Sequence, residues 1–119
     1  CSINKLLKES DFISIHLNYN KNTKSFINAD LLSLMKNECI LINTSRGGII
    51  DEDALYNTLK NNKIGGAGID VFSQEPYYGK LCGLNNVVLT PHIGAYAKEI
   101  RIKMEVEAVN NLIRGLFEK

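Results

Sequence analysis

Four short apolar runs, separated by polar breaks, are the feature that most constrains the fold of this chain. One of them, residues 39–43, reads Cys-Ile-Leu-Ile-Asn and holds no polar side chain before its end. An unbroken apolar run of this length is typical of a strand that is covered on both faces. Helical patterns stand between the runs, which predicts an α/β fold built on a doubly wound parallel sheet with flanking helices. The four predicted strands span residues 11–16, 39–43, 65–71 and 86–90.

The segment after residue 50 carries the signals of a helix start. Asp51 is a candidate N-cap, and Glu52 and Asp53 lie in the first turn, where the helix dipole favours negative charge. Lys60 and Lys63 lie at the opposite end, where positive charge is favoured. This pattern predicts a helix of about three turns between the second and third strands.

Two further helices follow from apolar spacing. Residues 29–36 predict a short helix before the second strand. A long helix is predicted from about Ala97 to Arg114, with Gly115 at its C-cap. Residues 18–28 and 73–85 are polar or broken by Pro and Gly, and are expected to form loops.

Composition limits the class of protein. The 119 residues carry a net charge of +1 and are 45% hydrophobic, which fits one globular domain and gives no reason to expect nucleic-acid or membrane partners. No apolar run is long enough to span a bilayer, and the start does not resemble a signal peptide. The chain does not begin with Met, so we expect a fragment or a processed product. Three cysteines without CxxC spacing predict free thiols in a reducing compartment, the cytoplasm, with Cys39 buried and inert.

Polar residues stand where the predicted strands end. Arg46, Asp70 and His92 each follow or end a different strand, and Glu75 lies a few residues past the third. In a parallel sheet the carboxyl ends of all strands open on one edge. The sequence therefore predicts that these four residues meet in one crevice.

Each of three residues in this group suits a distinct chemical task. The planar guanidinium of Arg46 matches a carboxylate bidentately. His92 can donate a proton to a carbonyl oxygen, and Glu75 can hold its other ring nitrogen and fix the tautomer. Pro76 follows Glu75 and Pro91 precedes His92, which stiffens the backbone at both places.

Every one of these residues also has a plain structural interpretation. Arg46 could be a surface arginine beside a turn, Glu75 a solvated loop residue, and His92 a structural histidine. His16, at the end of the first strand, is a better candidate for lining a ligand or for a structural role than for catalysis. Asp70 ends an apolar strand and needs a partner, which a helix N-cap or a ligand amide would supply.

The glycine-rich run at residues 65–68 is not a phosphate cradle. It lacks the GxGxxG spacing, and no helix is predicted to begin there. Walker A, zinc-ligand and Gly-x-Ser-x-Gly spacings are absent from the sequence as well, so no metal site is predicted.

Three segments resemble the signatures of the D-isomer-specific 2-hydroxyacid dehydrogenase family, in the family's order and spacing. The resemblance covers nearly the whole chain and looks closest to D-3-phosphoglycerate dehydrogenase, with hydroxypyruvate and glyoxylate reductases next. The three segments are residues 42–52 (INTSRGGIIDE), 66–76 (GAGIDVFSQEP) and 89–94 (LTPHIG).

The resemblance implies a role for each matching residue. Arg46 would bind the substrate carboxylate and polarise the carbonyl, His92 would be the general acid–base, and Glu75 would pair with His92. Asp70 would contact the nicotinamide carboxamide. The family's usual His-x-Pro stretch reads His16-Leu17-Asn18 here, so the proline is missing. The implied cofactor-binding residues are His16, Leu17, Thr44, Ser45, Arg46, Asp70, His92, Gly94 and Ala95.

The resemblance also implies an incomplete domain. Family members carry a GxGxxG turn, an acidic ribose ligand and a substrate domain that these residues do not match. We therefore expect residues 1–119 to form the second half of a Rossmann-type NAD-binding domain, the C-terminal part of it. Without the pyrophosphate site, the 119 residues alone are expected neither to bind NAD tightly nor to turn over.

The implied activity belongs to a full-length parent protein. It would transfer a hydride between NAD(H), with NADP left open, and a D-2-hydroxy acid or its 2-oxo acid, such as 3-phosphoglycerate, glyoxylate or hydroxypyruvate. The alternatives are an NAD-sensing transcriptional corepressor and an inactive domain of the same fold. The parent is expected to be a homodimer, and the chain alone to self-associate through the open edge of the strand at residues 11–16.

Overall fold

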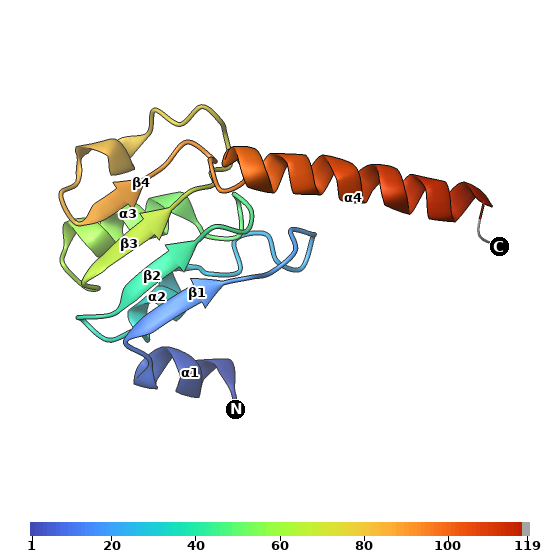
Figure 1. The fold of residues 1–119 in the computed structure, drawn as a ribbon. Coiled ribbons are helices and arrows are strands. Elements are labelled where there is room, and N and C mark those ends of the chain that lie inside the picture. Colours follow the sequence, from blue (N-terminus) through green and yellow to red (C-terminus); the bar gives the residue numbers. More distant parts are fainter. Residues whose placement is uncertain (118–119) are drawn as a thin grey trace.

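The computed structural model describes residues 1–117 and contains one four-stranded parallel sheet (Figure 1). The strands lie side by side in the order in which they occur in the chain. This confirms the predicted parallel sheet with flanking helices, and the predicted strand positions agree to within two residues. The strands are β1 (Phe12–Ile15), β2 (Ile40–Asn43), β3 (Gly66–Ile69) and β4 (Val87–Leu89).

One face of the sheet forms the core. Ile13 pairs in register with Leu41, and Leu41 with Ala67, and all three side chains are buried. Helices α2 (Ala29–Ser33) and α3 (Glu52–Lys60) lie behind this face in Figure 1 and pack against each other. Both helices lie on one side because right-handed crossovers between strands placed in sequential order always return over the same face.

The opposite face of the sheet is not covered by residues 1–117. Phe12 is 73% exposed and Val88 is 69% exposed, while Ile40 and Ile42 are half-buried. The prediction that β2 would be covered on both faces is therefore wrong for the described residues. The apolar run is continuous, but only its alternate residues face helices, because α2 and α3 lie on a single side.

The cap at the start of α3 confirms the sequence prediction. The Asp51 carboxylate accepts a hydrogen bond from the amide of Ala54 at 3.0 Å, and Glu52 and Asp53 fill the first turn. Helix α2 ends at Ser33, three residues earlier than predicted, because the chain turns there and leaves residues 34–36 outside the helix.

Two short helices were not predicted. Helix α1 (Ile3–Glu9) begins at a Ser2 N-cap and buries Leu7 beside β1. A single 3-10 turn, η1 (Lys80–Gly83), lies within the long loop between β3 and β4 and buries Leu81. Both are short helices that bury a single leucine, which is too weak an apolar pattern to stand out in the sequence.

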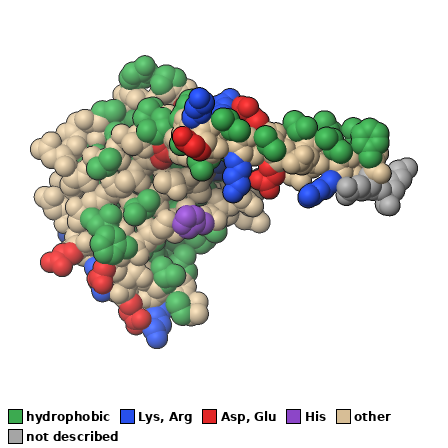
Figure 2. All heavy atoms as spheres, in the orientation of Figure 1, with side chains coloured by type: hydrophobic (Ala, Val, Ile, Leu, Met, Phe, Trp, Pro, Cys, Tyr) green, Lys and Arg blue, Asp and Glu red, His purple; other side chains and the backbone are tan. Residues whose placement is uncertain are grey.

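Helix α4 (Lys98–Phe117) projects away from the sheet, as Figure 1 shows. None of its residues is buried, and Figure 2 shows hydrophobic side chains along the exposed arm. The prediction of a C-cap at Gly115 is wrong, because the helix continues through Gly115 to Phe117. Nothing lies within 4 Å of a Cβ built at Gly115, so no neighbouring segment forces the helix to end there.

The cysteines within residues 1–117 are all free thiols. Cys39 is fully buried, as predicted, and burial raises the pKa of its thiol. Cys1 and Cys82 are exposed.

Across the described residues, the helices are all too short or too polar to cross a membrane.

Candidate active site

An ion-pair contact between His92 and Glu75 lies at the carboxyl edge of the sheet. His92 Nδ1 is 2.9 Å from Glu75 Oε2, and the two residues are 17 positions apart in the chain. Both side chains are partly open to solvent, with 48% and 38% of their surfaces exposed. The imidazole is therefore bonded on one nitrogen and free to meet a ligand with the other.

The second oxygen of the Glu75 carboxylate is bound as well. Glu75 Oε1 accepts a hydrogen bond from the amide of Phe72 at 3.0 Å. The hydrogen bond to His92, followed by the one from Phe72, lowers the pKa of the Glu75 carboxyl below its ordinary value. Glu75 is thus held as a carboxylate that faces His92.

His92 stands in a strained backbone conformation. Its φ angle is +54°, which non-glycine residues adopt only at an energetic cost, and its own amide donates to Thr90 O at 3.0 Å. This conformation turns the segment between β4 and α4 sharply and places the imidazole beside Glu75. A strained residue persists only where its surroundings hold it.

Asp70 supplies that hold. Its buried carboxylate accepts hydrogen bonds from the Thr90 hydroxyl, from the Ile93 amide at 3.0 Å and from the Gly94 amide at 3.3 Å. These donors flank His92 on both sides. The partner expected for Asp70 was a helix N-cap or a ligand amide. The structure shows instead the turn that carries His92.

The charge state of Asp70 follows from its contacts. Burial alone would raise the pKa of the Asp70 carboxyl, but the hydrogen bonds from Thr90, Ile93 and Gly94 outweigh it and lower the pKa below the ordinary value. Oδ1 receives two donors and Oδ2 one. A carboxylate oxygen accepts two donors readily, so Oδ2 keeps room for one more.

The turn that carries Arg46 is organised by Asn43, the last residue of β2. The Asn43 side chain is 1% exposed, accepts from the amide and hydroxyl of Ser45, and donates to Arg46 O at 3.1 Å. The backbone at Arg46 is thus fixed. Its guanidinium is exposed and, within residues 1–117, donates only to Ser45 O, at 2.7 Å, so it is available to an incoming anion.

Gly47 brings the Arg46 turn into contact with the loop that carries Glu75. A Cβ atom at Gly47 would lie 1.9 Å from Phe72 O and 2.7 Å from Ser73 N. Only a glycine allows such an approach between two backbones. The two loops are therefore packed directly against each other.

Several predicted cofactor residues line a shared pocket beyond the ends of β1 and β2. Its volume is about 580 Å³. His16 lies here with Arg46, and its Nε2 is 2.8 Å from Ser14 Oγ, so it is bonded to the strand that it directly follows. The pocket is lined by His16, Leu17, Asn18, Tyr19, Thr44, Ser45 and Arg46.

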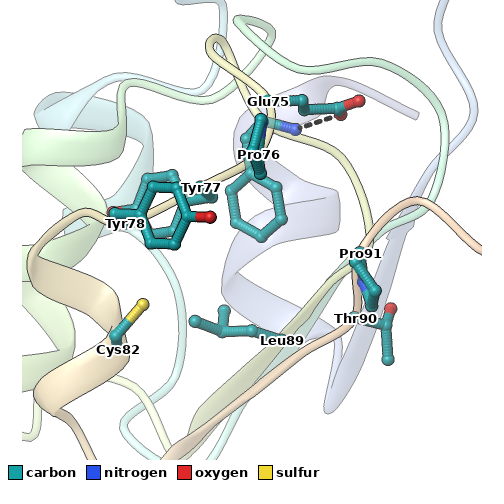
Figure 3. A pocket seen from close by; sticks show the side chains of 9 residues that line it. Glu75, Pro76, Tyr77, Tyr78, Cys82, Leu89, Thr90 and Pro91 are labelled. Carbon is teal, nitrogen blue, oxygen red and sulfur yellow. Dashed lines mark hydrogen bonds between the residues drawn. The ribbon is translucent and has the colours of Figure 1, made fainter.

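A second pocket, of about 590 Å³, lies beside Glu75 at the β4 edge (Figure 3). Glu75 and Pro76 border it from the loop after β3, and Thr90 and Pro91 border it from the segment after β4. Its remaining lining is mainly apolar, from Phe72, Tyr77, Tyr78, Cys82 and Leu89. Glu75 thus borders this mainly apolar pocket and also contacts His92.

The predicted residues form two groups. In the first group, hydrogen bonds join His92 to Glu75 and Gly94 to Asp70, and the backbone of residues 92–94 links the two pairs. Arg46 shares its pocket with the residues after β1 and makes no hydrogen bond to Glu75 or His92. Ala95 lies half-buried in the turn that follows Gly94.

Three residues with positioning contacts were not singled out from the sequence. Asn43 ends the apolar run before Arg46, and Thr90 lies two residues before His92, so a polar residue next to each candidate was the available signal. Glu52 was interpreted only as a helix-dipole partner, yet its carboxylate also accepts from the Ser73 amide at 2.7 Å. A contact across 21 residues gives no local signal in the sequence.

The comparisons with known proteins agree on one family. Residues 1–94 match the family model described as D-isomer specific 2-hydroxyacid dehydrogenase, NAD binding domain. The chain is 52% identical over 109 residues to a glyoxylate reductase of Thermococcus litoralis, covering 91% of this chain and 33% of that protein. It is 43% identical over 115 residues to a D-3-phosphoglycerate dehydrogenase of Synechocystis sp., covering 93% of this chain and 21% of that protein. The glyoxylate reductase is therefore the more similar of these two, and not the phosphoglycerate dehydrogenase.

A solved structure shows the same fold. An acyclic imino acid reductase in complex with NADPH and D-Arg superposes with a TM-score of 0.92 at 44% identity, covering all of this chain and 38% of that one. The chain spans between a fifth and two fifths of the length of the proteins compared here.

Proposed function

The chain belongs to the D-isomer-specific 2-hydroxyacid dehydrogenase family, and from this we propose that it carries the proton-transfer group of an enzyme that interconverts a 2-hydroxy acid and a 2-oxo acid. The observation that carries the proposal is the His92–Glu75 contact at the carboxyl edge of the sheet. The Glu75 carboxylate accepts a hydrogen bond from His92 Nδ1, so His92 Nε2 is the nitrogen left to face the substrate. In the direction of reduction, protonated His92 gives its Nε2 proton to the carbonyl oxygen.

Arg46 is proposed to bind the substrate carboxylate. Its guanidinium is exposed and pairs with no acidic side chain among residues 1–117, while its backbone is held by Asn43. A planar fork of donors on a fixed backbone binds a carboxylate bidentately. The same positive charge would polarise the neighbouring carbonyl.

The residues present fit the nicotinamide end of an NAD(P) cofactor, which when bound supplies or accepts the hydride. The free acceptor site on Asp70 Oδ2 suits a carboxamide N–H, and the pocket after β1 and β2 is wide enough for part of the cofactor. The start of α3 does not suit the phosphates, because Asp51, Glu52 and Asp53 surround it with negative charge. Besides Arg46 and Asp70, the residues proposed to line the cofactor are His16, Leu17, Thr44, Ser45, His92, Gly94 and Ala95.

We propose that residues 1–119 form the C-terminal part of the NAD-binding domain of a longer enzyme. The family match and the coverage of the relatives support this. The phosphate-binding turn and the substrate domain would then lie outside these residues. By themselves the 119 residues would neither bind NAD tightly nor turn over, and the choice between NAD and NADP would lie outside them as well.

Glyoxylate or hydroxypyruvate is the proposed substrate class, with 3-phosphoglycerate less favoured by the identities given above. The imino acid reductase adds a second candidate, a 2-imino acid, because that protein matches the whole of this chain. One assay distinguishes these two substrate classes, in which glyoxylate is offered with and without added amine. Reduction without amine indicates the 2-oxo acid, and reduction that depends on amine indicates the 2-imino acid. The relatives named above are reductases and dehydrogenases, and they give the corepressor alternative no support.

Replacing His92 tests the proposed function. In the protein that carries this chain, His92→Ala is expected to lower turnover about 10²- to 10⁴-fold, since general acid–base catalysis contributes that much. Asp53→Ala, an exposed change on α3, is the control and should leave turnover unchanged. Full turnover by His92→Ala with a 2-oxo acid and NAD(P)H would contradict the proposed role of His92 in proton transfer.

A homodimer and a cytoplasmic location are also part of the proposal. The open edge of β1 and the exposed Phe12 support self-association of the chain, because an unpaired strand edge is a template for another chain. The three free thiols support a reducing compartment. A monomeric mass by light scattering at micromolar concentrations would count against self-association.

A further inference from the structure

One peptide unit, between Phe72 and Ser73, is held from two sides. Its carbonyl oxygen lies against Gly47, where a Cβ atom would come within 1.9 Å. Its N–H, on Ser73, donates to Glu52 Oε1 at 2.7 Å. Gly47 lies in the turn before α3 and Glu52 is the first residue of α3, so one short stretch of chain, residues 47–52, contacts both polar ends of this peptide.

The peptide between Phe72 and Ser73 is next to the Phe72 amide, which is the amide that donates to Glu75. The Phe72 N–H donates to Glu75 Oε1 at 3.0 Å, and Glu75 Oε2 contacts His92 at 2.9 Å. Rotation of the 72–73 peptide would turn the neighbouring Phe72 amide and shift the Glu75 carboxylate. Because Phe72 is buried and stacked on Tyr77, its side chain resists the same movement.

We propose that Glu52 is a positioning residue, which ties the start of α3 to the loop that carries Glu75 and so fixes the geometry of the Glu75–His92 pair. This rests on the proposed function, because it deepens the role of that pair. Glu52 touches neither His92 nor Glu75 and acts through the 72–73 peptide. The segment that carries Arg46 and the loop that carries Glu75 are thereby held as one unit.

The neighbouring residue, Asp53, separates this role from general effects of helix charge. Asp53 also lies in the first turn of α3, but its carboxylate pairs with Lys80 at 2.9 Å and its side chain is 79% exposed. Both residues are acidic and both complement the helix dipole. Glu52 contacts the peptide near Glu75, whereas Asp53 reaches the same loop at Lys80, in η1, so Asp53→Ala is a matched control for the Ser73 contact.

The first readout is hydrogen exchange at the Ser73 amide, measured by NMR on the 119-residue chain. Glu52→Ala removes the acceptor, and Glu52→Asp keeps the charge but shortens the side chain by one methylene. Both variants should speed Ser73 exchange at least about tenfold, because a hydrogen bond to a charged group is lost. Glu52→Gln keeps an acceptor oxygen and should restore most of the protection, while Asp53→Ala should change nothing.

The second readout is the titration of the Glu75 carboxyl by carbon-detected NMR. If the Phe72 amide is displaced, its hydrogen bond to Glu75 weakens. Because this hydrogen bond lowers the pKa of Glu75, that pKa should rise in Glu52→Ala and Glu52→Asp. Simple removal of the negative charge at Glu52 would move it down. The sign of the change therefore distinguishes positioning from a direct charge effect.

Activity is the third readout. In the protein that carries this chain, Glu52→Ala and Glu52→Asp should lower kcat by about tenfold, less than His92→Ala, because a catalytic pair is displaced and not removed. If Glu52→Ala does not fold, Glu52→Asp carries the test. Unchanged Ser73 exchange and an unchanged or lowered Glu75 pKa would overturn the proposal. A fully active His92→Ala protein would instead overturn the proposed function, and the exchange result would be unaffected.

Discussion

The two halves of the sheet edge are held together in different ways. After β3 and β4, the polar side chains bond across the molecule, since His92 to Glu75 spans 17 residues and Gly94 to Asp70 spans 24. After β1 and β2, they bond close by, since Arg46 donates to the adjacent residue and His16 contacts Ser14, two residues away. We call these the bonded half (residues 70–75 and 90–94) and the open half (residues 16–19 and 44–46).

The difference shows which part of the chemistry is pre-organised. The proposed proton transfer requires a fixed tautomer and a fixed distance, and the His92–Glu75 contact in the bonded half would supply both. Recognition of a charged ligand requires a free donor, and the open half supplies one in Arg46. Substitutions in the bonded half should therefore mainly lower stability, and substitutions in the open half should mainly weaken ligand binding.

The largest effect on stability is expected from Asp70→Ala in the bonded half. This change removes a buried carboxylate and leaves the Thr90 hydroxyl and the Ile93 and Gly94 amides without their acceptor. The free energy of unfolding should fall by about 3 kcal/mol or more, measured by urea denaturation. The matched control is Asp30→Ala, an exposed acid on α2, which should stay within about 0.5 kcal/mol. A loss below about 1 kcal/mol at Asp70 would show that the bonded half is not rigid.

Gly47→Ala is expected to come next, because Gly47 lies where the two halves meet. The added methyl group would collide with the 72–73 peptide, and overpacking of this kind costs about 1–3 kcal/mol. Urea denaturation should show the loss, and the amides of Phe72 and Ser73 should exchange faster. Gly83→Ala has open space around its Cβ and serves as the control. Equal stability of the two variants would contradict the close packing.

Acid should weaken the bonded half first. The pKa of Asp70 is lowered in the folded state, so its contribution to stability is complete above the unfolded value of about 3.9 and is lost as the pH falls through the lower folded value. Asp70→Asn lacks this titration. The stability difference between wild type and Asp70→Asn should be constant from pH 7 to 5 and shrink below pH 4. A difference that persists unchanged to pH 2 would refute the assignment.

The smallest effect on stability is expected from Arg46→Ala in the open half. The guanidinium is exposed and, in the part of the chain that the structure describes, bonds only to Ser45, so the free energy of unfolding should change by less than about 0.5 kcal/mol. In the protein that carries this chain, KM for a 2-oxo acid should rise about 10- to 100-fold, through the loss of charge-assisted hydrogen bonds. Arg46→Lys should recover only part of this loss, because the planar fork is missing. If Arg46→Ala were destabilised but kept a normal KM, the proposed difference between the open half and the bonded half would be contradicted.

The sequence predicted the strands and the cap of α3 well because both depend on local patterns. Ile40, Leu41 and Ile42 form an unbroken apolar run of strand length, of which Leu41 is buried, and Asp51 supplies a cap regardless of distant contacts. The fold class follows from the alternation of such elements. The meeting of Glu75 and His92 at one edge follows from the parallel order of strands.

What could not be predicted depends on contacts between distant segments. The positive φ of His92 is maintained by Asp70, and the contact of Glu52 with Ser73 joins the start of α3 to a distant loop, so neither has a local signature in the sequence. The exposure of α4 was also hidden, because an apolar helical pattern indicates a face that suits burial and not the surface that covers it. Gly115 likewise could end a helix or continue it.

The turn held by Asp70 also sets the direction of α4. The amides of Ile93 and Gly94 are bound to Asp70, and the helix begins four residues later at Lys98. Twenty helical residues form a rod of about 30 Å, so a rotation of about 10° at this pivot would carry Phe117 through an arc of about 5 Å. A rotation of the turn that Asp70 holds would therefore produce a larger displacement at the far end of α4.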